Sequence, residues 1–194
     1  MSLVHKVTDI SSSSIWQTRF LLSDCNDNEV IQPIVEAFLQ SVQQYASQER
    51  FDMHQLREAC EFIKELSFTH NIMATIILDH IKSSGNASPY LDILPTIYSC
   101  KDAATITDLA TTLLEQEVGD DQFISMLKVL LELPVDSNIQ FAVQNSLKDA
   151  IVSFSSSHYP GLLKLSLQYN NTSRTIFDIT KLWRKQVLSF ICFL

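Results

Sequence analysis

Helical patterns that arrive in pairs constrain this chain more than any other feature of its sequence. From Asp52 onward a pair recurs about every 30 to 38 residues, a spacing typical of helix-hairpin repeats. Such repeats bury their apolar faces by stacking on their neighbours. We therefore predict an all-α fold, an α-solenoid of irregular HEAT- or armadillo-like antiparallel helix pairs, with a compact helical bundle as the alternative.

The composition favours a packed helical chain. Of 194 residues, 46% are hydrophobic and 19% are charged, which excludes a disordered chain. Three glycines and five prolines are too few for the turns of a sheet protein. The net charge of −8 argues against general nucleic-acid binding, although a local basic face could still contact phosphate.

The cysteines and the first residues of the chain indicate its cellular compartment. Cys25, Cys60, Cys100 and Cys192 lie far apart in the sequence, so they predict neither a zinc site nor a disulfide framework. This usage favours an intracellular, reducing compartment. The first residues lack the apolar core of a signal peptide, and no apolar run has the length of a membrane span. We therefore expect no membrane partner.

Three segments are expected along the chain. Residues 1–14 are polar and predict a flexible N-terminus, residues 15–187 predict the helical-repeat region, and residues 188–194 form an apolar tail. Large apolar side chains make up most of the tail's end: Phe190, Ile191, Phe193 and Leu194. A closed domain seldom ends on such a run, so we expect the tail to face a partner or to be the truncated end of a longer solenoid.

Capping residues predict where several helices begin or end. Asp52 is a candidate N-cap, with Gln55 in the second position of a capping box. Asp102 is a candidate N-cap of a later helix. Gly119 is expected to close that helix as a left-handed C-terminal residue.

Two prolines fall within helical patterns. Pro33 is expected in or near the first turn of its helix, because the missing N–H matters least there. Pro95 is expected to kink or shorten the helix in which it lies. Both residues therefore predict helix boundaries.

No pattern in the sequence predicts catalysis. Asp79 and His80 could supply metal ligands together with His70 across a hairpin, but such residues are far more often polar positions on an exposed helix face. The five histidines contain no HExxH motif and no pair spaced by four residues. The sequence also lacks a G-x-S-x-G motif and a glycine-rich phosphate loop. We expect no enzymatic activity, no metal, no cofactor and no small-molecule substrate.

The last helical pattern carries basic residues along one side. At 100° per residue, Arg174, Lys181, Arg184 and Lys185 fall within about 100° of one another, opposite an apolar face. Such a stripe could bind phosphate or an acidic partner. The interpretation that we favour is a solvated face that balances an otherwise acidic chain.

The order of several segments resembles the N-terminal helical-repeat region of the Fanconi anaemia group D2 family. The resemblance rests on an Ile31-Gln32-Pro33 helix start, a Leu94-Pro95 kink and Leu-rich helices in matching order, over roughly residues 21–185. The segments are IQPIVEAFLQSV, LREACEFIKEL, LDILPTIYSC, FISMLKVLLELPVDSN, YPGLLKLSLQY and TIFDITKLWRK. The paralogous group I family is the second-best resemblance.

The resemblance implies a non-enzymatic scaffold in the nucleus. Its family pairs with the Fanconi group I paralogue and clamps DNA during interstrand-crosslink repair, so DNA contact through the full complex is implied here. No lysine of this chain matches the family's ubiquitination site. The alternative is a generic HEAT- or armadillo-type adaptor, such as part of a nuclear transport receptor, that binds a protein segment in a concave groove.

Overall fold

The computed structural model describes residues 10–153 together with residues 162, 164, 165 and 181, and that part of the chain is helical with no strand. The all-α prediction is therefore confirmed for these residues. The chain divides into two compact units, Met1–Thr105 and Ile106–Leu194. Each unit is described by itself.

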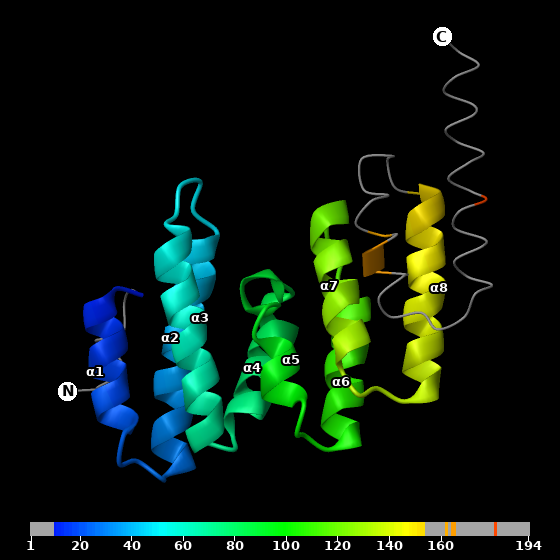
Figure 1. The fold of residues 1–194 in the computed structure, drawn as a ribbon. Helices are drawn as coiled ribbons and strands as arrows, with labels where there is room; N and C mark the ends of the chain where they lie inside the picture. Colours follow the sequence, from blue (N-terminus) through cyan, green and yellow to red (C-terminus); the bar gives the residue numbers. More distant parts are fainter. Residues whose placement is uncertain (1–9, 154–161, 163, 166–180, 182–194) are drawn as a thin grey trace. The chain divides into compact units, whose positions relative to one another are not determined.

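Helices of the first unit follow one another closely along the chain (Figure 1). They are α1 (Ser12–Leu22), α2 (Asn28–Ala46), α3 (Met53–Thr69), α4 (Met73–Ser84), the 3-10 helix η2 (Ser88–Tyr90) and α5 (Leu94–Tyr98). Helix α6 (Ala103–Leu114) begins at the end of this unit, and α7 (Asp120–Glu132) and α8 (Ser137–Ser153) belong to the second.

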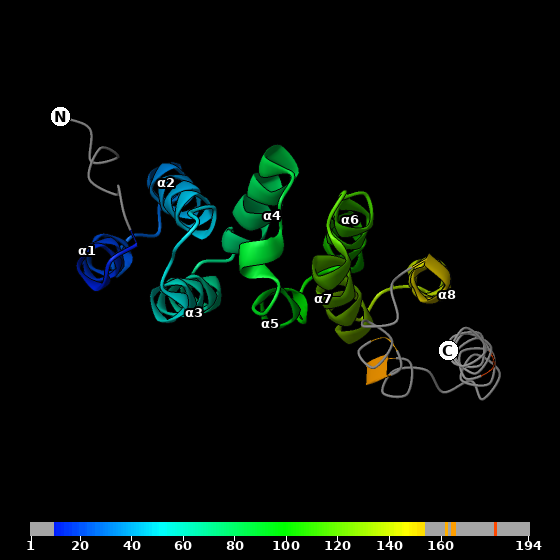
Figure 2. The same ribbon diagram turned by 90° about the horizontal axis from the view of Figure 1, so that it is seen from above.

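Alternate helices of the first unit pack side by side. Helix α3 contacts both α1 and α5, while α2 contacts α4, so α2 and α4 lie on one side and α3 and α5 on the other (Figure 2). The Ser12 hydroxyl donates to Glu58 Oε2 (3.1 Å) and Arg19 pairs with Glu65, and both contacts join residues 46 apart. Because the separation is the same at both points, α1 and α3 run parallel.

One apolar stripe of α3 forms part of the core. Its members are all buried: Leu56, Ala59, Cys60, Ile63 and Leu66. Phe62 on the same helix meets Phe38 of α2 edge to face, with ring centroids 5.4 Å apart and an interplanar angle of 89°. This geometry suits the ring quadrupoles and joins the two sides of the unit.

Two buried tyrosine hydroxyls tie the short helices to the long ones. The Tyr90 hydroxyl donates to the Leu39 carbonyl of α2 (2.9 Å), and the Tyr98 hydroxyl donates to the Ala74 carbonyl of α4 (2.6 Å). Burial raises the pKa of Tyr90. The hydroxyl therefore stays protonated and able to donate.

A tyrosine also completes the N-terminal cap of α3. As predicted, Asp52 is the N-cap, and its carboxylate accepts from the His54 N–H (2.8 Å). The Gln55 side chain does not close the box directly. The Tyr45 hydroxyl accepts from the Asp52 N–H (2.9 Å) and donates to Gln55 Oε1 (2.7 Å), so it bridges the two positions.

Helix α2 begins earlier than the sequence predicted. Asp27 is its N-cap and accepts from the Glu29 N–H at 3.0 Å, so Pro33 lies inside the helix and not in its first turn. The prediction for Pro33 was therefore wrong, because Asp27 supplies a better start than the proline. Pro95 does lie at the start of the short helix α5 and accompanies its shortening, as expected.

Gly119 does not end a helix in the left-handed conformation. Its φ is −71°, and it stands at the N-cap of α7, because α6 already ends at Leu114. Among the described residues the positive φ belongs to Gly85, which closes α4 at 65°. The prediction for Gly119 is corrected accordingly.

The last residues of the predicted flexible segment 1–14 are ordered in the structure. Ser11 is the N-cap of α1 and its hydroxyl accepts from the Ser14 N–H (3.3 Å). Ile10 is buried, with 1% of its surface exposed. Residues 10–14 of the segment predicted to be flexible therefore belong to the packed helical structure.

Helices α6 and α8 carry acidic caps and buried apolar stripes where they are described. Helix α7 packs on α8, and the Asp136 carboxylate accepts from the N–H groups of Asn138 (2.8 Å) and Ile139 (2.9 Å). At the start of α6, the Asp102 carboxylate accepts from the Thr105 N–H (3.0 Å), as expected for an N-cap. The buried stripes comprise Ile106, Leu109, Ala110 and Leu113 on α6, and Val143, Leu147 and Ala150 on α8.

Candidate functional site

A groove runs between α1 and α3 on the surface of the first unit. Its volume is about 460 Å³. Buried Ile15 and Phe62 provide apolar walls, and Trp16 stands at the α1 side. The remaining lining residues are polar or charged: Ser12, Arg19, His54, Arg57, Glu58, Glu61 and Glu65.

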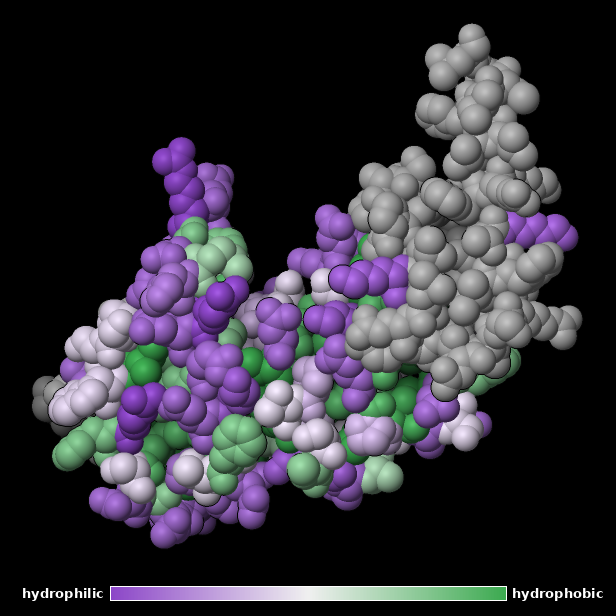
Figure 3. Space-filling view, in the orientation of Figure 1, coloured by the Kyte–Doolittle hydropathy of each residue, from purple (hydrophilic) through white to green (hydrophobic). Residues whose placement is uncertain are grey.

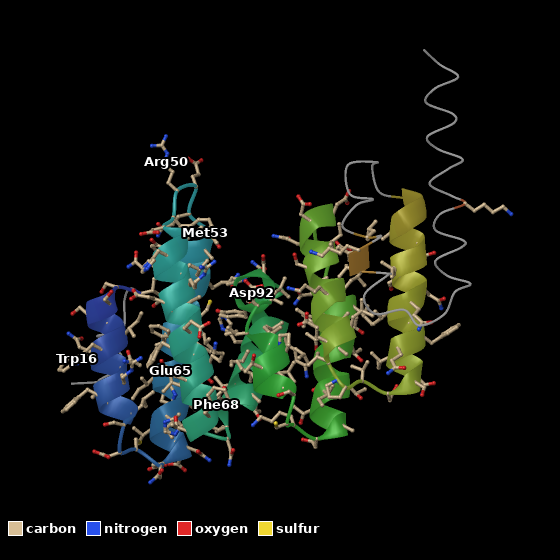
Figure 4. The ribbon with its side chains drawn as sticks, in the orientation of Figure 1. Trp16, Arg50, Met53, Glu65, Phe68 and Asp92 are labelled. Carbon is tan, nitrogen blue, oxygen red and sulfur yellow. The ribbon has the colours of Figure 1, made fainter. Side chains whose placement is uncertain are left out.

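Helix α1 carries apolar side chains on two faces. Ile15 and Leu22 are buried, whereas Trp16 and Phe20 remain 64% and 69% exposed. The two exposed rings stack on each other, with centroids 5.8 Å apart and planes at 14°. Figure 4 shows Trp16 projecting from the outer side of α1, with Glu65 on the neighbouring helix α3. An exposed, ordered aromatic pair of this kind is typical of a protein-binding surface.

Arg19 crosses the groove. Its guanidinium lies over the Phe62 ring, 5.4 Å from the centroid, and pairs with the Glu65 carboxylate. This arrangement combines a cation–π contact with an ion pair, which suits the flat guanidinium better than an ammonium group. The pair is about half exposed, so solvent screens it and its contribution to stability is small.

Three glutamates form a row along α3. Glu58, Glu61 and Glu65 recur at helical spacing on the groove side. Glu58 accepts from the Ser12 hydroxyl, and Glu61 pairs with Lys64 on its own helix. The row gives the groove an acidic side, and Figure 3 shows this hydrophilic surface over α3 beside the apolar flank of α1.

The histidines that could have supplied metal ligands lie in structural positions. His70 is buried at the C-cap of α3, and His80 meets the Tyr90 ring edge to face at 5.7 Å. Burial lowers the pKa of His80, and the nearby Glu36 carboxylate opposes this shift. Within the described ranges, no group of three or more His, Cys, Asp or Glu side chains is arranged to hold a metal ion.

The thiols differ sharply in their surroundings. Cys60 is buried, its Sγ donates to the Pro89 carbonyl at 3.1 Å, and burial raises its pKa to about 12. Cys100 is exposed, and Cys25 is intermediate. A buried thiol with a raised pKa has little thiolate character, so Cys60 is expected to be unreactive in the folded chain.

The residues singled out from the sequence mostly lie outside the described part. Lys181 is helical and exposed, whereas Arg174, Arg184 and Lys185 and the tail residues Phe190, Ile191, Phe193 and Leu194 are not described. Sequence reasoning missed the groove. The signal it could have used is the presence of Trp16 and Phe20 on a second apolar face of an 11-residue helix.

Comparisons with known proteins did not identify the chain. No protein-family model matches it, and neither the curated proteins nor the solved structures contain a significant match. Among the described helices, none combines the length and the apolar character that crossing a membrane requires. The resemblance to the Fanconi anaemia group D2 family stays a prediction.

Proposed function

We propose that this chain is a non-enzymatic helical-repeat scaffold, an irregular α-solenoid of HEAT- or armadillo-like helix pairs, that binds a protein partner through the groove between α1 and α3. The packing of the first unit supports the repeat interpretation, because α1 lies parallel to α3 while α2 contacts α4. Stacked helix pairs place alternate helices in this relationship.

The exposed Trp16–Phe20 stack is the observation that carries the proposal. Rings that are 64% and 69% exposed remain largely hydrated in the chain alone. A partner that covered them would gain about 1.5–3 kcal/mol for each fully buried large apolar side chain. The charged rim of the groove would then orient the partner, as in other protein interfaces.

The resemblance supplies the identity of the partner in this proposal. It is the Fanconi group I paralogue, bound in the nucleus during repair of DNA interstrand crosslinks, with DNA contacted through the full complex. The apolar and basic C-terminal residues predicted from the sequence would add contact surface. A HEAT- or armadillo-type adaptor for other nuclear proteins is the alternative.

A pull-down with matched variants tests the proposal. The tagged full chain, a Trp16→Ala/Phe20→Ala variant and a Phe141→Ala control are compared in nuclear extract, with bound proteins identified by mass spectrometry. Phe141 is similarly exposed, at 64%, but lies in the second unit. Circular dichroism verifies that each variant is folded.

Each outcome of the pull-down has a distinct meaning. Recovery of the group I paralogue by the parent chain and the Phe141 variant, with loss in the Trp16/Phe20 variant, supports the proposal. Equal recovery by all three removes the groove as the docking surface. Recovery of transport cargoes instead favours the adaptor.

A further inference from the structure

We infer that the partner segment that occupies the α1–α3 groove is an amphipathic helix that inserts an arginine between Trp16 and the glutamate row of α3. This inference rests on the proposed docking function and specifies the chemistry of the partner. It follows from the way in which Arg19 of the chain itself fills one end of the groove.

Arg19 shows which group these walls accept. Its guanidinium lies against the Phe62 ring and pairs with Glu65. An aromatic face next to a carboxylate is a general guanidinium site, because arginine is weakly hydrated, stacks on rings and pairs with carboxylates. The end of the groove that contains Glu65 is therefore occupied from within.

An aromatic side chain and two further glutamates line the groove toward the N-terminal end of α3. The separation of 46 residues between paired positions places Trp16 level with Phe62, next to Glu61. Glu58 lies one turn before Glu61. The hydrogen bond from the Ser12 hydroxyl to Glu58 is exposed and the Glu61–Lys64 ion pair is partly exposed, so water or another donor can replace either partner at small cost.

The charge of the groove favours a basic occupant. Its three lining glutamates face two lining arginines, Arg19 and Arg57, and Arg19 is already paired. The whole chain carries a net charge of −8, which attracts a basic segment over longer distances. An acidic segment would be repelled by the glutamates of the groove and by the net negative charge of the chain.

The shape of the groove favours a helical occupant. It runs between two parallel helices from Ser12 to Arg19, which is about two helical turns. A helix laid along such a groove contacts it with residues spaced by three and four positions. Apolar residues at those positions would cover the Trp16–Phe20 stack, and an arginine beside them would reach Glu58 and Glu61.

Trp16 fluorescence provides a direct test. The full chain is prepared with Trp183→Phe, so that Trp16 is the remaining tryptophan. The probe is a synthetic 14-residue helix of leucine and arginine at heptad spacing, with a twin in which glutamate replaces every arginine. A saturable change in Trp16 emission with the arginine helix, and none with the glutamate twin, is expected.

Charge-neutral variants establish where the arginine binds. Glu58→Gln/Glu61→Gln is expected to weaken binding about tenfold, while Glu115→Gln/Glu117→Gln, which removes the same charge from the second unit, should leave affinity within about twofold. Equal weakening by both variants would show general electrostatic attraction and overturn the inference. So would binding of the glutamate twin or an unchanged affinity of the Glu58/Glu61 variant.

The two proposals fail in different ways. If the Trp16/Phe20 variant loses its partner in the pull-down while the Glu58→Gln/Glu61→Gln variant retains it, the docking function stands and the arginine inference is wrong. If neither variant affects capture, the groove is not the docking surface.

Discussion

Replacing Pro33 by alanine is expected to stabilise the first unit. Pro33 lies inside α2, where its ring nitrogen cannot donate to the Glu29 carbonyl one turn earlier. Alanine restores that donor and removes the contact between the proline ring and the same carbonyl. Alanine also has the highest helix propensity of all residues.

The size of the effect follows from two opposing contributions. Proline inside a helix costs about 3 kcal/mol or more. Against this, proline stiffens the unfolded chain, and its removal returns about 0.4–1 kcal/mol of conformational entropy to that state. We therefore expect Pro33→Ala to raise the free energy of unfolding by about 2 kcal/mol, or Tm by about 4–8 °C.

Pro95→Ala is the matched control. Pro95 stands in the first turn of α5, where an N–H has no partner within the helix. The stiffening of the unfolded chain then dominates, so this variant is expected to lose about 0.4–1 kcal/mol. The two substitutions are chemically identical and should change stability in opposite directions.

Urea unfolding followed by circular dichroism at 222 nm measures both variants. A loss of stability in Pro33→Ala would refute the reasoning. It would mean that Pro33 lies in or near the first turn of α2, as the sequence alone predicted, and that the helix does not extend back to Asn28. Equal effects at Pro33 and Pro95 would show that the position of a proline in its helix does not decide whether its replacement stabilises or destabilises the chain.

Three further predictions concern a buried thiol, a partly buried histidine and the basic stripe near the C-terminal end. Cys60 should resist alkylation until the chain unfolds, because its thiol is buried with a raised pKa, whereas Cys100 should react at once; mass spectrometry of iodoacetamide-treated chain reads this out. Because burial lowers the pKa of His80 from 6.5, the unfolded chain takes up that proton first on acidification. Stability should therefore fall as the pH drops below about 6.5, and less steeply in His80→Gln, when unfolding is followed across pH. Reversing the charges of Arg184 and Lys185 should weaken any DNA binding and reduce its salt dependence. An unchanged affinity and an unchanged salt slope in a DNA titration would show that the basic stripe does not contact phosphate.

Local side-chain chemistry made several helix boundaries predictable. Asp52 and Asp102 could be identified as N-caps because a carboxylate after a turn satisfies the first free N–H groups of a helix. Gly119 was misassigned because glycine suits both ends of a helix, and the choice depends on where the preceding helix stops. The Tyr45 bridge in the cap of α3 could not be predicted, because it joins residues from two helices.

The groove depends on geometry that periodicity does not encode. Apolar spacing predicts which residues of α1 and α3 are buried, but not how one helix is shifted along the other. That shift brings Arg19 to Glu65 and lets Trp16 and the glutamates line the same groove. A change of one turn would form a different groove from the same sequence.

The hydroxyl contacts of Tyr90 and Tyr98 have a consequence for how this chain can evolve. Each hydroxyl binds a backbone carbonyl, at Leu39 and Ala74, and every amino acid provides that acceptor. Mutations at the accepting positions therefore leave the hydrogen bond intact, provided that the helix persists. Across relatives the tyrosines would be retained while their acceptor residues drift, so residue covariation would not register these two contacts even though they hold the helices together.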